Sequence, residues 1–311
     1  MMKHFEVRRR VVDAYDLLVE ELRGEWPGRP LPGYEAAIRH RSKFESCGRL
    51  LPTPHGHEVY HWCRRPACPT CATHWGRALG RKLVQACPKA DKGEFRMATL
   101  VIDIAPDPDA AFDAFRTARR TLANAVDYRR RAKGLDRAGW RSFGLAGALE
   151  VDLFEAEDFT RLGTAKREQY RALGFDQQRS SGPQWVATVH ALVRVGSLGD
   201  DAVRSLLKGV APEVHLQGLH DDQTLVEAAE GVVGYAAKVQ ITTALACGGS
   251  RPWSPERLKD YVASSARCSH GRQGFRLLIK PKAVTSRPKV SDKLKSKSLQ
   301  VEYDEPMPFV F

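Results

Sequence analysis

The sequence predicts a mixed α+β fold that is preceded by a zinc-binding module. Three segments alternate apolar and polar residues as strands do, and several others repeat apolar residues at the three- and four-residue spacing of a helix. A cluster of cysteines falls within one short stretch. The chain has 311 residues, which exceeds the usual size of one domain, so we expect a large domain or a domain with an appended module.

Composition indicates a globular protein with a polyanionic partner. Hydrophobic residues make up 42% of the chain, which is normal for a protein with a core. The formal net charge of +12 favours nucleic acid as the partner, and a generally basic proteome is the alternative explanation. No apolar run is long enough to span a membrane, and the amino terminus is charged rather than signal-like. We therefore expect a soluble, cytoplasmic protein with no membrane partner.

Residues 1–45 are predicted to form an N-terminal helical segment. Between Phe5 and Arg23, apolar residues recur on one side of a helix, namely Val11, Tyr15, Leu18 and Leu22. The stretch Gly24–Gly33 ends this helix, because prolines cannot continue it.

Residues 46–90 are predicted to form a zinc module. Thiolates bind zinc tetrahedrally, and two cysteines separated by two residues can hold one metal ion from a single turn. Pro69 stiffens such a turn here. The four expected ligands are Cys47, Cys63, Cys68 and Cys71. Because zinc binding at such sites contributes on the order of 10 kcal/mol to folding, we expect this zinc ion to be structural.

Other interpretations of this stretch stay open. The competing ligands are His55, His57, His61 and His74, and unrelated free thiols are the simplest alternative. The odd total of 7 cysteines fits a reducing compartment and a metal site better than a disulfide framework. Cys87, Cys247 and Cys268 remain as incidental thiols. Basic residues surround the module and suggest contact with a phosphate backbone: Arg64, Arg65, Arg77, Arg81 and Lys82.

Two strands with a helix between them follow the module. The strand Phe95–Ile104 shows period-two alternation, and the helix Pro108–Lys133 shows helical spacing with three arginines near its end. The second strand, Ala146–Phe154, places Glu150 and Asp152 on the same face.

The third strand, Gln184–Val195, carries a histidine on an otherwise apolar strand. Period two places Thr188 and His190 on one face. A lone strand histidine is more often structural than a ligand. Before this strand, a charged helix or lid-like insertion is expected at Glu155–Leu173. After it, a helix is expected at Asp200–Lys208 and an extended segment at Glu213–Leu219.

The segment Glu227–Gln240 is predicted to be a helix that presents a tyrosine. Its apolar stripe is Val226, Ala229, Val233 and Ala236. Tyr235 and Lys238 lie on a different face, one turn apart. An ammonium group beside a phenol favours the phenolate and also attracts phosphate. The alternative is a surface tyrosine near a solvated lysine.

The remainder of the chain divides into two parts. Residues 246–279 are expected to be an extension with a helix at Ser254–Ala266 and a strand at Phe275–Ile279. Residues 280–311 begin as a flexible basic arm and end in an acidic and aromatic tail. The tail is expected either to pack back on the fold or to dock on host replication proteins.

Taken in order, these motifs resemble those of the plasmid and phage rolling-circle replication initiators of the HUH endonuclease superfamily. The cysteine stretch is followed by the motifs Phe95–Leu100, Gly147–Val151, Trp185–Leu192 and Gly234–Lys238. The resemblance extends from Cys47 to Lys238 and lies in the order and spacing of five weak motifs. It implies a central antiparallel sheet with helices on one face, and metal and DNA on the other, with residues 91–245 as the nicking domain.

One position departs from the family pattern. The family's histidine strand carries two imidazoles on one face that hold a divalent cation, and this chain has Thr188 at the first position and His190 at the second. Glu150 resembles the third ligand, and Asp152 on the same face could compensate for the lost imidazole. Magnesium or manganese accepts such oxygen ligands.

The chemistry implied by the resemblance is nicking of single-stranded origin DNA. Tyr235 would attack the scissile phosphate with Lys238 beside it, leaving a 5′-phosphotyrosyl link and a free 3′-hydroxyl that primes synthesis. Two alternatives stay open. One is a catalytically silent DNA-binding protein, in which Thr188 marks a dead site. The other is a transposase of the same superfamily, although the next tyrosine, Tyr261, is far from Tyr235 in the sequence.

Overall fold

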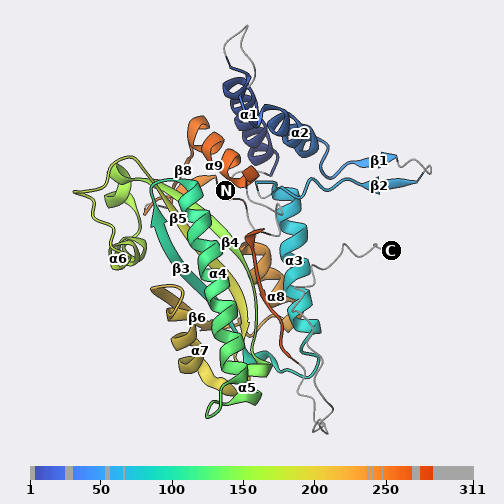
Figure 1. The fold of residues 1–311 in the computed structure, drawn as a ribbon, viewed down its shortest axis with the longest axis vertical. Coiled ribbons are helices and arrows are strands. Elements are labelled where there is room, and N and C mark those ends of the chain that lie inside the picture. Colours follow the sequence, from blue (N-terminus) through green and yellow to red (C-terminus); the bar gives the residue numbers. More distant parts are fainter. Residues whose placement is uncertain are drawn as a thin grey trace, which may run out of the picture.

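The computed structural model describes residues 4–24, 31–52, 57–65, 67–236, 239, 241–246, 248–267 and 274–282 (Figure 1). Its centre is a five-stranded antiparallel sheet with the strand order β6-β3-β5-β4-β9. The strands are β3 (Phe95–Ala105), β4 (Gly144–Glu155), β5 (Pro183–Arg194), β6 (Glu213–Gly218) and β9 (Arg276–Ile279). The predicted α+β class and the antiparallel sheet are therefore confirmed.

One face of the sheet packs on the long helix α4 (Pro108–Arg131). Asp107 caps this helix by accepting a hydrogen bond of 2.8 Å from the Ala110 amide, and Pro108 occupies the first turn, where no amide proton is needed. Phe112 and Phe115 are buried against the apolar positions of the strands. Those strand positions include Ala98, Leu100, Ala187, Val189, Leu149 and Val151.

The opposite face is covered at its two ends by different elements. At one end, α3 (Pro69–Gln85) and α8 (Leu225–Ala236) pack on an apolar patch of the strands. At the other end, the 3-10 segment η2 (Ala156–Arg161) and helix α6 (Thr164–Ala172) pack on a second patch. The first patch contains Phe95, Ala146 and Leu192, and the second contains Val101, Phe154 and Val186. The expectation of helices on one face only is wrong, because apolar strand residues at both ends of this face need cover.

Between the two patches the same face carries polar side chains. Period two places Thr99 between Phe95 and Val101, and His190 between Leu192 and Val186. This polar row is where the predicted metal ligands lie.

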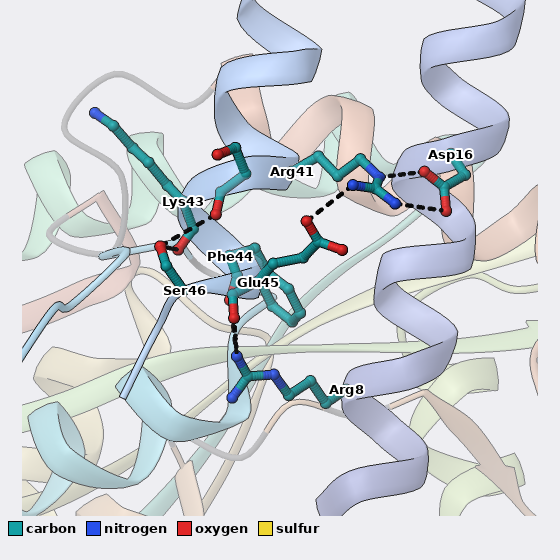
Figure 2. A network of polar contacts seen from close by, with 8 residues as sticks. Arg8, Asp16, Arg41, Lys43, Phe44, Glu45 and Ser46 are labelled. Carbon is teal, nitrogen blue, oxygen red and sulfur yellow. Dashed lines mark hydrogen bonds and ion pairs between the residues drawn. The ribbon is translucent and has the colours of Figure 1, made fainter. Parts of the chain in front are cut away.

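The N-terminal helices α1 (His4–Arg23) and α2 (Tyr34–Glu45) pack on each other, and α1 also packs on α9 (Pro255–Arg267). Figure 2 shows two arginines that hold this region together. Arg8 donates hydrogen bonds to the carbonyl oxygens of Phe44 and Cys47, at 3.2 and 3.0 Å. Arg41 contacts Asp16 of α1 and donates to Glu45 at 2.9 Å. The first helix was predicted within one residue of its start, and it is tied directly to the start of the cysteine module.

A thin hairpin projects from the body of the protein between α2 and α3 (Figure 1). It consists of β1 (Leu50–Pro52) and β2 (Glu58–Tyr60), which pair antiparallel. Further short elements complete the fold: η1 (Lys92–Glu94), α5 (Arg137–Ser142), η3 (Gly196–Leu198), α7 (Gly199–Lys208), β7 (Thr242–Ala244) and β8 (Ser250–Pro252).

The packed side of α8 differs from the predicted one. Val226 is predicted to lie in the buried stripe of the tyrosine helix, but it is 45% exposed, because the packed side of α8 runs through Leu225, Ala228, Ala229 and Val233 instead. Residues 283–311, which hold most of the expected basic arm and its tail, lie outside the described residues. In the described part of the chain, no helix has the length and apolar character that crossing a membrane requires.

Candidate functional site

The four predicted cysteines come together in a buried cluster. The Sγ atoms of Cys47 and Cys71 are 3.5 Å apart, those of Cys63 and Cys71 are 3.7 Å apart, and those of Cys47 and Cys68 are 3.6 Å apart. A tetrahedral zinc ion with zinc–sulfur bonds of about 2.3 Å separates its sulfur ligands by about 3.8 Å. The cluster therefore has the ligand set and the spacing that a metal such as zinc requires.

Local backbone geometry explains how these cysteines converge. Cys68 caps α3, and its sulfur accepts a hydrogen bond from the Cys71 amide at 3.5 Å. The hairpin returns the chain so that the Cys63 amide donates to the sulfur of Cys47 at 3.4 Å. Arg64 adopts the left-handed backbone conformation, with φ of 56°, and its amide donates to Cys71 Sγ at 3.3 Å. Amide donors of this kind stabilise thiolates, which are the form that binds metal.

The competing histidine ligands do not take part. Among the described residues, the metal-competent group contains only the four cysteines, so His57, His61 and His74 are outside it. His74 instead stacks on the Trp62 ring, with centroids 4.4 Å apart. His55 lies outside the described residues.

The second candidate centre is the polar row on the sheet. His190 Nε2 lies 2.8 Å from Glu150 Oε2, and His190 Nδ1 lies 3.0 Å from the hydroxyl of Thr99. Two ligands of one octahedral cation with bonds of about 2.1 Å lie about 3 Å apart. In the structure, Glu150 and His190 contact each other directly as a histidine–carboxylate pair, and among the described residues they belong to no group of three or more metal-ligating side chains.

The other two predicted ligands are placed less favourably. Thr188 pairs with Glu150 across β5 and β4 and is half-buried. Asp152 Oδ2 contacts Lys166 Nζ of α6 at 2.6 Å. Burial raises the pKa of Asp152, and the Lys166 ammonium opposes that shift. The four residues share one face, but in the described part of the chain Glu150, Asp152 and His190 do not form a group of three metal-ligating side chains.

The tyrosine helix lies next to this row. α8 packs on β4 and β5 and runs antiparallel to α3, since Ala229 meets Gly80 while Gly234 meets Arg77. Arg81 of α3 also pairs with Glu230 of α8 at 3.4 Å. The C-terminal end of α8 is thus directed toward the first turns of α3. The Tyr235 side chain and Lys238 lie outside the described part of the structure.

The row includes residues that sequence reasoning missed. Strand pairing aligns His215, Thr99, His190, Ala148 and Arg276 across all five strands. His215 Nε2 lies 2.8 Å from the side-chain nitrogen of Gln169 in α6. The strand that contains Arg276 was predicted, but no sequence signal identifies its neighbour in the sheet. Comparison with protein-family models, with curated proteins and with solved structures gave no match for this chain.

Proposed function

We propose that this protein is a rolling-circle replication initiator of a plasmid, phage or other mobile element, and that it nicks single-stranded origin DNA through Tyr235. The observation that carries this proposal is the position of α8. The helix that bears the tyrosine packs on the two strands, β4 and β5, that bear Glu150 and His190. It covers the same face of the sheet, because Ala229 and Val233 contact the Leu192 and Ala146 patch.

The proposed reaction is a transesterification. The Tyr235 phenol gives up its proton to water as its oxygen attacks the scissile phosphorus and forms a 5′-phosphotyrosyl bond, while the bond to the 3′-oxygen breaks and that oxygen takes up a proton from water. A later hydroxyl can rejoin the strand, because the phosphodiester bond energy is kept. A divalent cation held by Glu150 and His190 would neutralise charge on the phosphate. Thr99 would orient the His190 ring, and Lys238 would attract the phosphate.

The other tyrosines that could serve as the nucleophile are in packed surroundings. Tyr170 is buried and stacks on Phe154 with centroids 4.9 Å apart. Burial raises the pKa of Tyr170 well above its ordinary value, and the nearby Asp152 and Glu150 add to the shift. Tyr261 is buried between Trp185 and Trp253 on the opposite face of the sheet. Neither phenol is accessible to a DNA strand, which supports Tyr235.

The proposal is tested with the Tyr235→Phe variant. This change keeps the ring and deletes the attacking oxygen, so the covalent DNA–protein product should vanish, a loss of more than about 10³-fold, while binding persists. The adduct is measured by denaturing gel electrophoresis after incubation with labelled single-stranded origin DNA and manganese. Tyr128→Phe is the matched control, since Tyr128 is 64% exposed on α4, on the other face of the sheet. An adduct that persists in Tyr235→Phe contradicts the assignment.

A catalytically silent DNA-binding protein is the second candidate function. Two features favour it: the Asp152 carboxylate already contacts the Lys166 ammonium, and Thr188 stands where the family pattern has a metal-binding histidine. Thr188→His adds a second imidazole next to Glu150, so it should raise nicking at low manganese if the site is an active but weakened one. If neither the wild type nor Thr188→His nicks any single strand that contains the origin, the silent function replaces the enzyme.

A further inference from the structure

A series of aromatic rings connects the hairpin to the central sheet. The ring centroids of Tyr60 and Trp62 are 6.3 Å apart, and Trp62 stacks on His74 at 4.4 Å with an interplanar angle of 20°. Trp75 meets His74 edge-on at 5.8 Å. The Arg276 guanidinium lies 4.3 Å from the centroid of the Trp75 ring. We call Tyr60, Trp62, His74 and Trp75 the aromatic track.

The track ends at the candidate centre. Arg276 of β9 pairs with Ala148 of β4, and Ala148 pairs on its other side with His190 of β5. The track therefore begins on the hairpin, which projects beside α3 in Figure 1. It continues in the second turn of α3 and reaches Arg276 at the end of the polar row.

Anchoring of the hairpin explains only part of this arrangement. The stacked pair of Trp62 and His74 holds the base of the hairpin against α3. Tyr60 lies farther out and is 51% exposed, and the neighbouring Leu50 is 47% exposed. A hairpin that served only to place cysteines would have no use for a large exposed ring in line with a half-buried stack.

The charge around the track identifies its partner. Arg49 and Arg64 are exposed at the base of the hairpin, and Arg77 is exposed on α3, two residues after Trp75. Aromatic faces next to cations bind unpaired nucleic acid bases, since every base has a π-face and each stacked base contributes about 1–3 kcal/mol. Bases in a duplex already stack on each other and cannot use such faces. The partner that fits is single-stranded nucleic acid.

We infer that Tyr60, the exposed outer ring of the aromatic track, stacks on a base of a single strand that flanks the reacting phosphate, while the inner rings of the track support Tyr60 and hold it in line with the row. The inference rests on the proposed function for the identity of the partner, but it does not require the nicking chemistry. The track positions the strand, and Arg276 marks the point where it reaches the row.

The test compares Tyr60→Ala with Val59→Ala in the full-length protein. The two residues face opposite sides of one strand of the hairpin, and both are large and exposed, at 51% and 46%. Binding to a fluorescent oligo(dT) strand is measured by anisotropy over a range of salt concentrations. Tyr60→Ala should weaken binding by about 5- to 150-fold, which is the loss of one stacked base, with an unchanged salt slope. Val59→Ala should bind within about twofold of the wild type.

Further arms separate stacking from charge and from folding. Arg49→Gln should lower the slope of log affinity against log salt concentration by about 0.7, because one phosphate contact is lost. Tyr60→Phe keeps the ring and should therefore bind oligo(dT) like the wild type. Duplex DNA should bind equally to the wild type and Tyr60→Ala, and oligo(U) reports whether RNA is also accepted. A strand with 5-iodouracil should cross-link to Tyr60.

The inference is overturned if Tyr60→Ala binds oligo(dT) like the wild type, or if Val59→Ala weakens binding equally. If the wild type does not nick DNA but Tyr60→Ala still weakens binding to oligo(dT), only the proposed function is refuted. A wild-type protein that binds no single strand would refute both.

Discussion

The imidazole of His190 has a partner on each ring nitrogen, and the two partners come from different strands. With Nε2 donating to the Glu150 carboxylate, Nδ1 accepts from the Thr99 hydroxyl. Period two alone placed Thr188 and His190 on one face. It could not identify Thr99, because the register between β3 and β5 depends on tertiary packing and not on either strand's own pattern.

A second histidine gives a pH-dependent prediction. His40 lies on α2, and in the described part of the chain its Nδ1 is buried without a hydrogen-bond partner. Burial lowers the pKa of His40 to about 4, and Arg65 and Lys43 add to the shift. The unfolded chain, with a pKa of about 6.5, then binds a proton before the folded protein does as the pH falls. The contribution of His40 to stability is therefore present above about pH 6.5 and is lost as the pH falls toward 4.

The measurement is the urea midpoint of unfolding between pH 7 and pH 4. His40→Gln removes the titrating group, so the free energy of unfolding of the variant should fall less steeply over this pH range than that of the wild type. The difference between the two slopes should correspond to at most about one bound proton. Carboxylates titrate in both proteins, which is why the difference between them is the relevant quantity. Parallel curves would show that His40 is protonated equally in the folded and unfolded states.

At the level of elements, α3 has three roles along its length. Its first turn carries Cys68 and Cys71, its second carries Trp75, and its middle packs on α8 at Gly80. A Cβ atom at Gly80 would lie 2.4 Å from the Ala229 carbonyl oxygen. The absence of a side chain at Gly80 is what allows the two helices to approach so closely.

Gly80→Ala should therefore destabilise the protein although alanine favours helices. We expect a loss of about 1–3 kcal/mol, because one helix must move away from the other. Gly231→Ala on α8 is the matched control: no atom lies within 4 Å of the added Cβ, so it should stabilise the protein by about 0.5–1 kcal/mol. Both are measured by urea denaturation. Equal effects of the two changes would show that the helices are not held in contact at Gly80.

Much of the fold could be predicted from the sequence, because long elements carry clear periodicity. The three long strands and the helices α1, α4 and α9 were located within a few residues of their observed bounds. The helix α5 and the hairpin were not assigned, since short elements have too few residues to show a period. The helix α2 falls within the predicted helical segment 1–45, but its bounds were not assigned, because only Ala37 and Phe44 of its residues are buried and they do not form an apolar stripe. The cysteine cluster followed from spacing alone, whereas the contact between Asp152 and Lys166 required knowledge of how α6 folds over the sheet.

On the scale of the whole molecule, the cysteine cluster joins elements that otherwise have little in common. Cys47 follows α2, Cys63 follows the hairpin, and Cys68 and Cys71 begin α3, while Arg8 of α1 donates to the Cys47 carbonyl oxygen. Loss of the cluster should therefore loosen the N-terminal helices and the aromatic track together.

Cys71→Ala should abolish zinc binding and leave the protein unfolded or aggregated, since coordination at such sites contributes on the order of 10 kcal/mol to folding. Cys87→Ala is the control, because Cys87 is also buried but lies outside the cluster. It should keep one zinc ion per chain at a cost of about 1 kcal/mol. Zinc is measured by elemental analysis, and stability by thermal unfolding with and without a chelator. Wild-type protein that contains no metal and has four readily alkylated thiols would contradict this expectation.

The last strand of the sheet comes from the far end of the described chain. β9 pairs with β4, Gly147 lying opposite Leu277, and α9 rests on α1, where Arg10 donates to the Trp253 carbonyl oxygen. Contacts between such distant residues raise the contact order, and they form only after most of the chain has left the ribosome. Until then β4 is an open edge that can pair with strands of other chains. Premature termination before residue 276 would therefore yield a fragment that is prone to aggregation, because it lacks the strand that closes this edge.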